Sequence, residues 1–257
     1  MEIKEDIKNL RQMLQEPRKS VDTWYGRHVM RAGSIFLTRI AIKRGLTPNQ
    51  VTWASLIAGI LSACFFSSGA WLLGVLLINL WYLLDHVDGE VARYTKTSSP
   101  SGFFFDTVIN YIIEPLIFLG IGCGLSGWSA NAWLALAVLG AFGSLLLGLI
   151  PMCEDSVIFT LCRKAGKLPR AEPQAPVKPA NPSSASRRFF SLWHLSITFP
   201  SVILSLTVVY CVSFLIGLPR VTATQLYLTY YAVSVTGVWI AQLFHKIKSR
   251  KLDKVTF

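Results

Sequence analysis

The sequence predicts an all-α, polytopic membrane protein with six transmembrane helices, preceded by amphipathic helices at the membrane surface. Three observations lead to this prediction. Apolar residues make up 52% of the 257 residues and charged residues only 15%, a balance unlike that of ordinary soluble domains. The apolar residues form runs long enough to cross a bilayer, and the basic residues lie almost entirely on one side of these runs.

Six apolar runs are expected to span the membrane. They are residues 51–67, 70–91, 103–124, 130–162, 192–217 and 224–244. If consecutive runs alternate in direction, 24 of the 25 Lys and Arg residues lie on one side and only Arg220 on the other. The positive-inside rule then places both termini in the cytoplasm, in the inner membrane if the source is bacterial. The net charge of +11 therefore faces anionic lipid headgroups rather than nucleic acid.

Residues 1–44 are predicted to form cytoplasmic helices that lie along the membrane surface. Ile3, Ile7, Leu10 and Leu14 recur at helical spacing with charged residues between them. Residues 20–43 alternate apolar residues with basic ones, among them Arg31, and are too short and too charged to span a bilayer. Both segments fit amphipathic helices with one apolar face.

The stretch at residues 85–110 joins the second and third predicted spans and carries acidic residues at membrane depth. A charged side chain there costs about 2.5–3.5 kcal/mol on insertion scales, so Asp85, Asp88 and Asp106 indicate a function. Asp85 and Asp88 share one helix face, and Asp106 and Asn110 share another. In a helical hairpin these oxygen-bearing side chains converge, and all-oxygen clusters suit Mg²⁺ or Mn²⁺.

This stretch resembles the signature of the CDP-alcohol phosphotransferase family. Seven of its eight positions match in identity and spacing: Asp85, Asp88, Gly89, Ala92, Arg93, Gly102 and Asp106. The eighth position is Asp in the family and Asn110 in this chain. The segment at residues 47–52 also resembles a second, weaker motif of the family, although Thr47 and Pro48 equally fit an ordinary helix start.

The resemblance implies an enzyme of phospholipid synthesis. Such an enzyme transfers a substituted phosphate from a CDP-alcohol, such as CDP-diacylglycerol, to an alcohol or phosphorylated alcohol and releases CMP. It also implies a catalytic membrane domain at residues 45–247 with a cytoplasmic site, two Mg²⁺ or Mn²⁺ ions, and a homodimer. By this resemblance Asp85, Asp88 and Asp106 would bind metal, with Asp106 also catalytic. The implied nucleotide contacts are Asn49, Thr52, Asp85, Gly89, Ala92, Arg93 and Gly102.

Asn110 occupies the position of the family's catalytic base. An amide cannot accept a proton at neutral pH, although its carbonyl oxygen can still bind a metal. Three explanations stay open at this point. The chain can use another base or an ionised acceptor, it can bind CDP-lipids without turnover, or it can be an engineered inactive variant.

The acceptor site is less defined. Residues 163–191 form a Pro-rich segment predicted to be a flexible cytoplasmic loop, and residues 248–257 form a basic tail. Two basic pairs border this loop, Arg163–Lys164 and Arg187–Arg188. They are consistent with charges that face lipid headgroups, or with contacts to a phosphorylated acceptor. Glu114 fits a hydrogen bond between helices, or a polar wall of the acceptor pocket. The acceptor candidates are Glu114, Arg163, Lys164, Arg187 and Arg188.

Overall fold

The computed structural model describes residues 2–16, 25–164 and 201–249, which form helices joined by short turns, with no strand among them. The first helices are α1 (Glu2–Leu14), a short π-helical segment η2 (Gly26–Met30) and α2 (Arg31–Lys43). The long helices follow as α3 (Pro48–Ser67), α4 (Trp71–Thr95), α5 (Pro100–Ser126) and α6 (Ala132–Lys164). The last described helices are α8 (Ser201–Leu215) and α9 (Arg220–Ser249).

The predicted class, an all-α integral membrane protein, is confirmed. Within the described residues, α3, α4, α5 and the first 18 residues of α6 are long and apolar enough to cross a membrane. Residues Val202–Leu215 form a shorter apolar helix. The count of six spans stays a prediction, since residues 165–200, which include the start of the fifth predicted span and most of the Pro-rich loop, lie outside the described residues.

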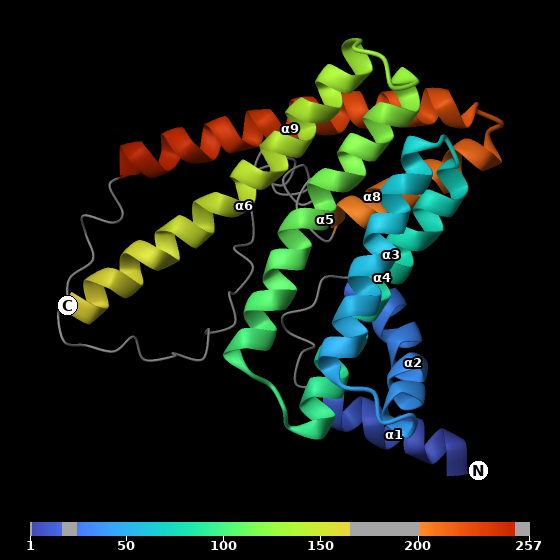
Figure 1. Cartoon of the computed structure of the whole chain (residues 1–257), viewed down its shortest axis with the longest axis vertical. Coiled ribbons are helices and arrows are strands. Elements are labelled where there is room, and N and C mark those ends of the chain that lie inside the picture. The colour runs from blue at the N-terminus through green and yellow to red at the C-terminus, as the bar shows by residue number, and fades with distance from the viewer. Residues whose placement is uncertain (1, 17–24, 165–200, 250–257) are drawn as a thin grey trace, which may run out of the picture.

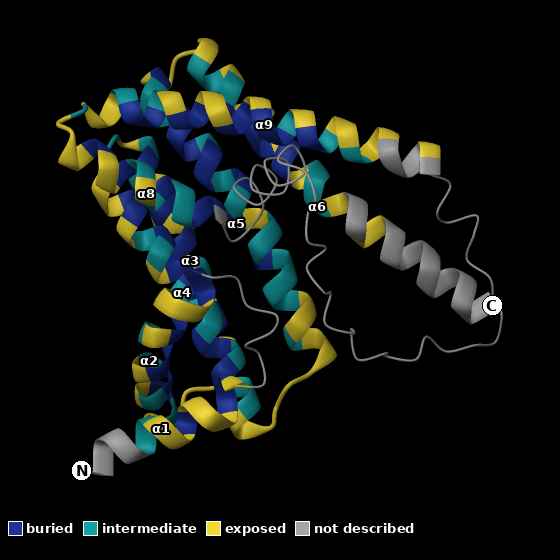
Figure 2. Ribbon diagram, turned by 180° about the vertical axis from the view of Figure 1, so that it is seen from behind, coloured by how far each residue is buried: buried dark blue, intermediate teal, exposed yellow. Residues whose placement is uncertain are grey.

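Helices α3, α4 and α5 form the centre of the molecule, with α6 and α9 packed beyond α5 (Figure 1). Their shared core contains large side chains such as Phe66 and Trp81 with almost no exposed surface. Phe118 of α5 stacks on Tyr231 of α9 with ring centroids 3.7 Å apart. Many positions on the outer faces of the helices are exposed (Figure 2). The exposed residues include apolar ones such as Ile57 and Leu76, as expected where lipid replaces water.

Two glycines let α5 approach α3 closely. A Cβ atom at Gly120 would clash with the carbonyl oxygen of Ala63, and one at Gly124 would clash with that of Phe66. Small residues allow such close backbone contacts between membrane helices, where packing drives association. These contacts fix the last third of α5 against the end of α3.

The predicted N-terminal helices are present. They pack against each other and against α4. Leu10 and Leu14 of α1 contact Ile35 of α2, and α2 lies along the end of α4 (Figure 1). Arg31, expected on the charged face, is instead buried, with its guanidinium 3.0 Å from the carboxylate of Glu90. The reason is that a buried carboxylate on α4 needs a cation beside it.

Candidate active site

Helix α3 begins with a capping box that orients its first turn. The Thr47 hydroxyl accepts a hydrogen bond from the backbone N–H of Gln50 (3.3 Å), and the Gln50 side chain accepts one from the N–H of Thr47 (2.9 Å). Pro48 occupies the first helical position. The capping interpretation of this segment is therefore confirmed, and the cap directs Asn49 and Thr52 toward α4 and α5.

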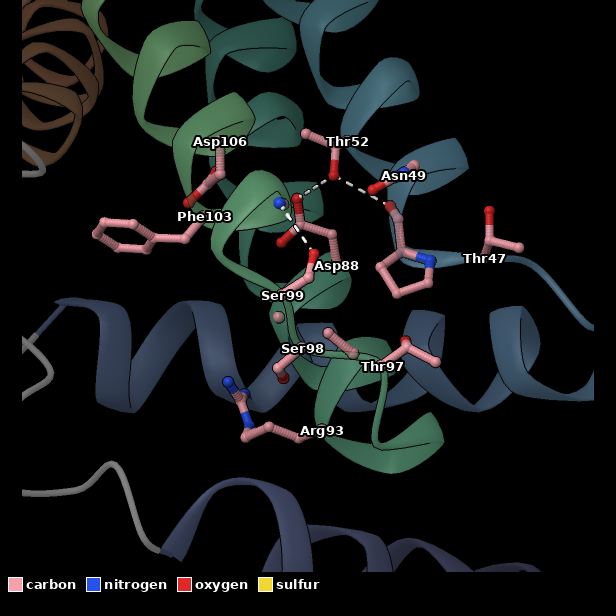
Figure 3. Close-up of a pocket in the computed structure, with 14 residues that line it drawn as sticks. Thr47, Asn49, Thr52, Asp88, Arg93, Thr97, Ser98, Ser99, Phe103 and Asp106 are labelled. Atoms are coloured by element: carbon pink, nitrogen blue, oxygen red, sulfur yellow. Dashed lines mark hydrogen bonds between the residues drawn. The ribbon is translucent and has the colours of Figure 1, made fainter.

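A cavity of about 480 Å³ lies between the start of α3, the end of α4 and the start of α5 (Figure 3). Its lining consists of Thr47, Pro48, Asn49, Thr52, Asp88, Gly89, Ala92, Arg93, Thr97, Ser98, Ser99, Gly102, Phe103 and Asp106. Every residue expected to contact the nucleotide lines this cavity except Asp85. Three consecutive helices thus bring most of the predicted nucleotide contacts together.

Thr52 and Asp88 connect α3 to α4 on one wall of the cavity. The Thr52 hydroxyl lies 2.7 Å from Oδ2 of Asp88 and 3.0 Å from the carbonyl oxygen of Pro48, so its proton is shared between two acceptors. Only 7% of Asp88 is exposed. Thr52 therefore holds the Asp88 carboxylate at the cavity wall and offsets part of the loss of its hydration.

Asp85 and Asn110 lie beside the cavity rather than in its lining. The Asn110 amide nitrogen donates a hydrogen bond to Oδ1 of Asp85 at 3.3 Å. Asn110 Oδ1 is buried and accepts no hydrogen bond from the residues that the structure describes. The carboxylates of Asp85, Asp88 and Asp106 are close enough to repel one another. The cluster thus combines excess negative charge with a buried amide oxygen, Asn110 Oδ1, that accepts no hydrogen bond from the described residues.

These groups have the chemistry of a site for a hard divalent cation. Carboxylate and amide oxygens are its preferred ligands, and a cation would offset both the repulsion and the unpaired oxygen. In the described part of the chain, however, no three His, Cys, Asp or Glu side chains are arranged to hold a metal ion as they stand. Asp88 instead accepts a hydrogen bond from Thr52, and Asp85 interacts with both Asn110 and Asp106. Metal binding by Asp85, Asp88 and Asp106 therefore stays a prediction.

Arg93 lies at the opposite end of the cavity from Thr52 (Figure 3). Its Nε donates a hydrogen bond to the carbonyl oxygen of Leu14, the last residue of α1, at 3.2 Å. One terminal nitrogen lies 3.2 Å from the place that a Cβ atom on Gly89 would occupy. The missing side chain of Gly89 thus leaves room for the guanidinium over the surface of α4.

The loop between α4 and α5 lines the cavity with hydroxyl groups. Lys96 ends α4 with φ at +54°, which turns the chain sharply. Ser99 then caps α5, its hydroxyl accepting a hydrogen bond from the N–H of Gly102 at 3.1 Å. The first turn of α5 thus lies at the cavity, and helix N-termini favour anionic groups such as phosphate.

Glu114 is the one acceptor candidate whose side chain the structure describes, and it lies outside this cavity. Glu114 accepts a hydrogen bond from the Tyr231 hydroxyl at 2.8 Å, which supports the helix-packing interpretation. Arg163 and Lys164 end α6, but their side chains are outside the described part of the structure, as are Arg187 and Arg188 entirely.

Reasoning from the sequence missed Glu90. This residue lies inside the signature stretch but carries none of its positions, and its side chain is fully buried. A carboxylate at the edge of an apolar run was the available signal, because burying it requires partners. Those partners come from α1 and α2, so the sequence alone did not connect them.

Comparison with known proteins supports the family resemblance drawn from the signature. The family model described as CDP-alcohol phosphatidyltransferase matches residues 45–166. This range covers the cavity, the acidic cluster and α3 to α6. Residues 45–166, slightly less than half of the 257 residues, are therefore similar to the CDP-alcohol phosphatidyltransferase family. The resemblance drawn from the signature is thus confirmed.

Several curated relatives align over the same region. A bifunctional IPC transferase and DIPP synthase of Thermococcus kodakarensis is 28% identical over 145 residues, or 56% of this chain and 33% of the relative. A phosphatidylinositol phosphate synthase of Streptomyces avermitilis is 33% identical over 93 residues, 35% of this chain and 37% of the relative. A CDP-diacylglycerol–serine O-phosphatidyltransferase of Helicobacter pylori is 32% identical over 94 residues, 34% of this chain and 40% of the relative. The chain thus spans 33–40% of the length of these three relatives.

Proposed function

We propose that this protein transfers a substituted phosphate from a CDP-lipid to the hydroxyl group of an acceptor alcohol and releases CMP. The observation that carries the proposal is the cavity itself. Six of the seven matching signature positions line it, together with Asn49 and Thr52 of the second motif. The matching family is named for CDP-alcohols, and one relative is named a CDP-diacylglycerol–serine O-phosphatidyltransferase, which supports a CDP-lipid as the donor.

In the proposed reaction the acceptor oxygen forms a bond to the lipid-linked phosphorus. The bond from that phosphorus to the oxygen bridging it to CMP breaks, CMP leaves with the electron pair, and the acceptor proton passes to a base. Arg93 neutralises phosphate charge at one end of the cavity, and the first turn of α5 offers backbone N–H groups. Thr52 keeps Asp88 oriented toward the site.

The proposed divalent cation would be held by Asp85, Asp88 and Asp106, with Asn110 Oδ1 as a further oxygen beside them. When bound, Mg²⁺ or Mn²⁺ would polarise the phosphorus and stabilise the leaving CMP. Asn110 supports a second candidate function, a membrane protein that binds CDP-lipids with little turnover. An amide there leaves the acceptor proton without the carboxylate that the family provides.

The test is release of CMP by the purified protein from CDP-diacylglycerol, with Mg²⁺ and a panel of acceptors that includes serine, inositol phosphate and glycerol phosphate. We expect CMP release that depends on one acceptor and stops when EDTA removes the cation. Binding of CDP-diacylglycerol without CMP release for any acceptor would favour the second function. An absence of both binding and release would refute both.

We also propose that the cavity, with both chain termini, faces the cytoplasm. The charge partition supports this sidedness, because 24 of the 25 basic residues fall on the cavity side of the predicted spans. In a variant without native cysteines, Ser129→Cys, on the turn between α5 and α6, should react with an impermeant thiol reagent in intact cells. Lys96→Cys should react only after the cells are opened. Both residues are exposed, so the opposite labelling pattern would refute the proposed orientation.

A further inference from the structure

We propose that Glu90 is a positioning residue that locks α1 onto α4, so that the end of α1 holds Arg93 in the cavity. The inference rests on the proposed function in one respect, the contact between Arg93 and the phosphates of the donor. It assigns a role in donor binding to the N-terminal helix, which lies outside the matched region and contributes no residue to the cavity lining.

Glu90 is fully buried and is the acceptor for four side chains. Its Oε1 accepts hydrogen bonds from Gln15 Nε2 (2.9 Å), Arg31 (3.0 Å) and Ser34 Oγ (2.8 Å), and its Oε2 accepts one from Thr38 Oγ1 (2.6 Å). Arg31, Ser34 and Thr38 belong to α2, whereas Gln15 follows the last residue of α1. One carboxylate on α4 thus fastens both N-terminal helices. A fully satisfied buried polar network of this kind holds its members in one arrangement.

Gln15 is the member of the network that fixes the position of α1. Its amide nitrogen contacts Glu90, the carbonyl oxygen of Arg31 (2.9 Å) and Ser34 Oγ (3.4 Å), and the residue is 9% exposed. Beside it, Leu14 is 1% exposed and packs on Ile35. The carbonyl group of Leu14 therefore cannot shift unless the contacts of Gln15 break as well.

That carbonyl group is the one that accepts the hydrogen bond from Arg93 Nε. The last four carbonyl groups of a helix have no partner within it, and the C-terminal end of a helix carries partial negative charge. Leu14 thus offers a fixed, electronegative acceptor to a cationic side chain. With Nε held there, the guanidinium lies against Gly89, and both residues line the cavity.

As a consequence, the two faces of α4 within the signature both contribute to the position of Arg93. Asp88, Gly89 and Arg93 line the cavity, while Glu90, between them on α4, faces away from it and sets the surroundings of Arg93 through α1. An arginine that is oriented before the ligand arrives loses less conformational entropy when it binds phosphate. Breaking the Gln15 contact should therefore weaken phosphate binding through Arg93 without touching the cavity.

The test is a double-mutant cycle on CDP affinity, measured by calorimetry on the full chain in detergent with Mg²⁺. Gln15→Leu is the informative variant, because Glu90→Gln would leave the buried Arg31 cation without its partner and can prevent folding. We expect Gln15→Leu to weaken CDP binding about tenfold in the native background. In an Arg93→Ala background, the same change should have no further effect, because Gln15 acts through Arg93.

Ser62→Ala is the matched control, since it also removes a buried hydrogen bond to α4, the one from Ser62 Oγ to the carbonyl oxygen of Gly74 at 2.7 Å. It should lower thermal stability to a similar degree and leave CDP affinity unchanged. If Gln15→Leu binds CDP as well as the native chain, or loses the same factor with and without Arg93, the inference is wrong while the proposed function stands. If the native chain binds no CDP, the proposed function fails and the inference falls with it.

Discussion

Replacing Asp88 by Asn should lower CMP release about 10³-fold. The change keeps the shape of the side chain and an oxygen that can accept the Thr52 hydrogen bond of 2.7 Å, so the cavity wall is preserved. It removes one of three neighbouring negative charges at the proposed cation site. A bound cation contributes several kcal/mol to such a transition state, and about 1.4 kcal/mol corresponds to a factor of ten in rate. The measurement is CMP release against Mg²⁺ concentration.

The matched control for this prediction is Asp6→Asn, the same change at a half-exposed carboxylate on α1 that pairs with Arg39 at 2.7 Å. Surface ion pairs contribute little to stability, so this variant should behave like the native protein. Part of the activity of Asp88→Asn should return at higher Mg²⁺ concentration, because weaker binding is offset by more ligand. Native CMP release by Asp88→Asn would show that the cation, if required, is held elsewhere.

The central helices and the cavity wall could be predicted because their signals are local. Runs of apolar residues predicted α3, α4 and α5 to within a few residues, and Thr47 with Pro48 marked the start of α3. The face shared by Asp85 and Asp88 follows from helical periodicity alone. The structure places Asp88 and Asp106 in one cavity lining, but through α3, because α4 and α5 both pack on α3 and contact each other little.

The details that depend on distant partners could not be predicted in the same way. Gln15 and Glu90 are separated by 75 positions, and no periodicity links them. The basic residues of residues 20–43 were interpreted as the polar face of an amphipathic helix, yet Arg31 is buried beside a carboxylate on another helix. Spacing did suggest that Asp85 and Asn110 converge with Asp88 and Asp106, but not that Asp85 and Asn110 lie outside the lining of the cavity.

Changing Asn110 to Asp should raise CMP release by about 10²–10⁴-fold at saturating Mg²⁺, the usual contribution of a general base. The side chain lies on α5 one helical turn from Asp106, and its amide nitrogen is 3.3 Å from Oδ1 of Asp85. An aspartate there would supply the carboxylate that the family places at this position, next to the proposed cation. The measurement is CMP release by both forms with the acceptor found in the panel.

The same substitution should have the opposite effect on stability when no cation is present. It replaces a hydrogen-bond donor to Asp85 with a like charge, in a cluster where Asp85, Asp88 and Asp106 already repel one another. The Asn110→Asp variant should therefore unfold at a lower temperature than the native chain in EDTA, and Mg²⁺ should stabilise it more. Asn131→Asp is the control: it also loses an amide donor, the one to the carbonyl oxygen of Ser126 at 3.4 Å, but it keeps the oxygen that caps α6 and lies outside the acidic cluster. Unchanged CMP release by Asn110→Asp, with Mg²⁺ still stabilising it, would show that another group takes the acceptor proton and that Asn110 serves to orient Asp85.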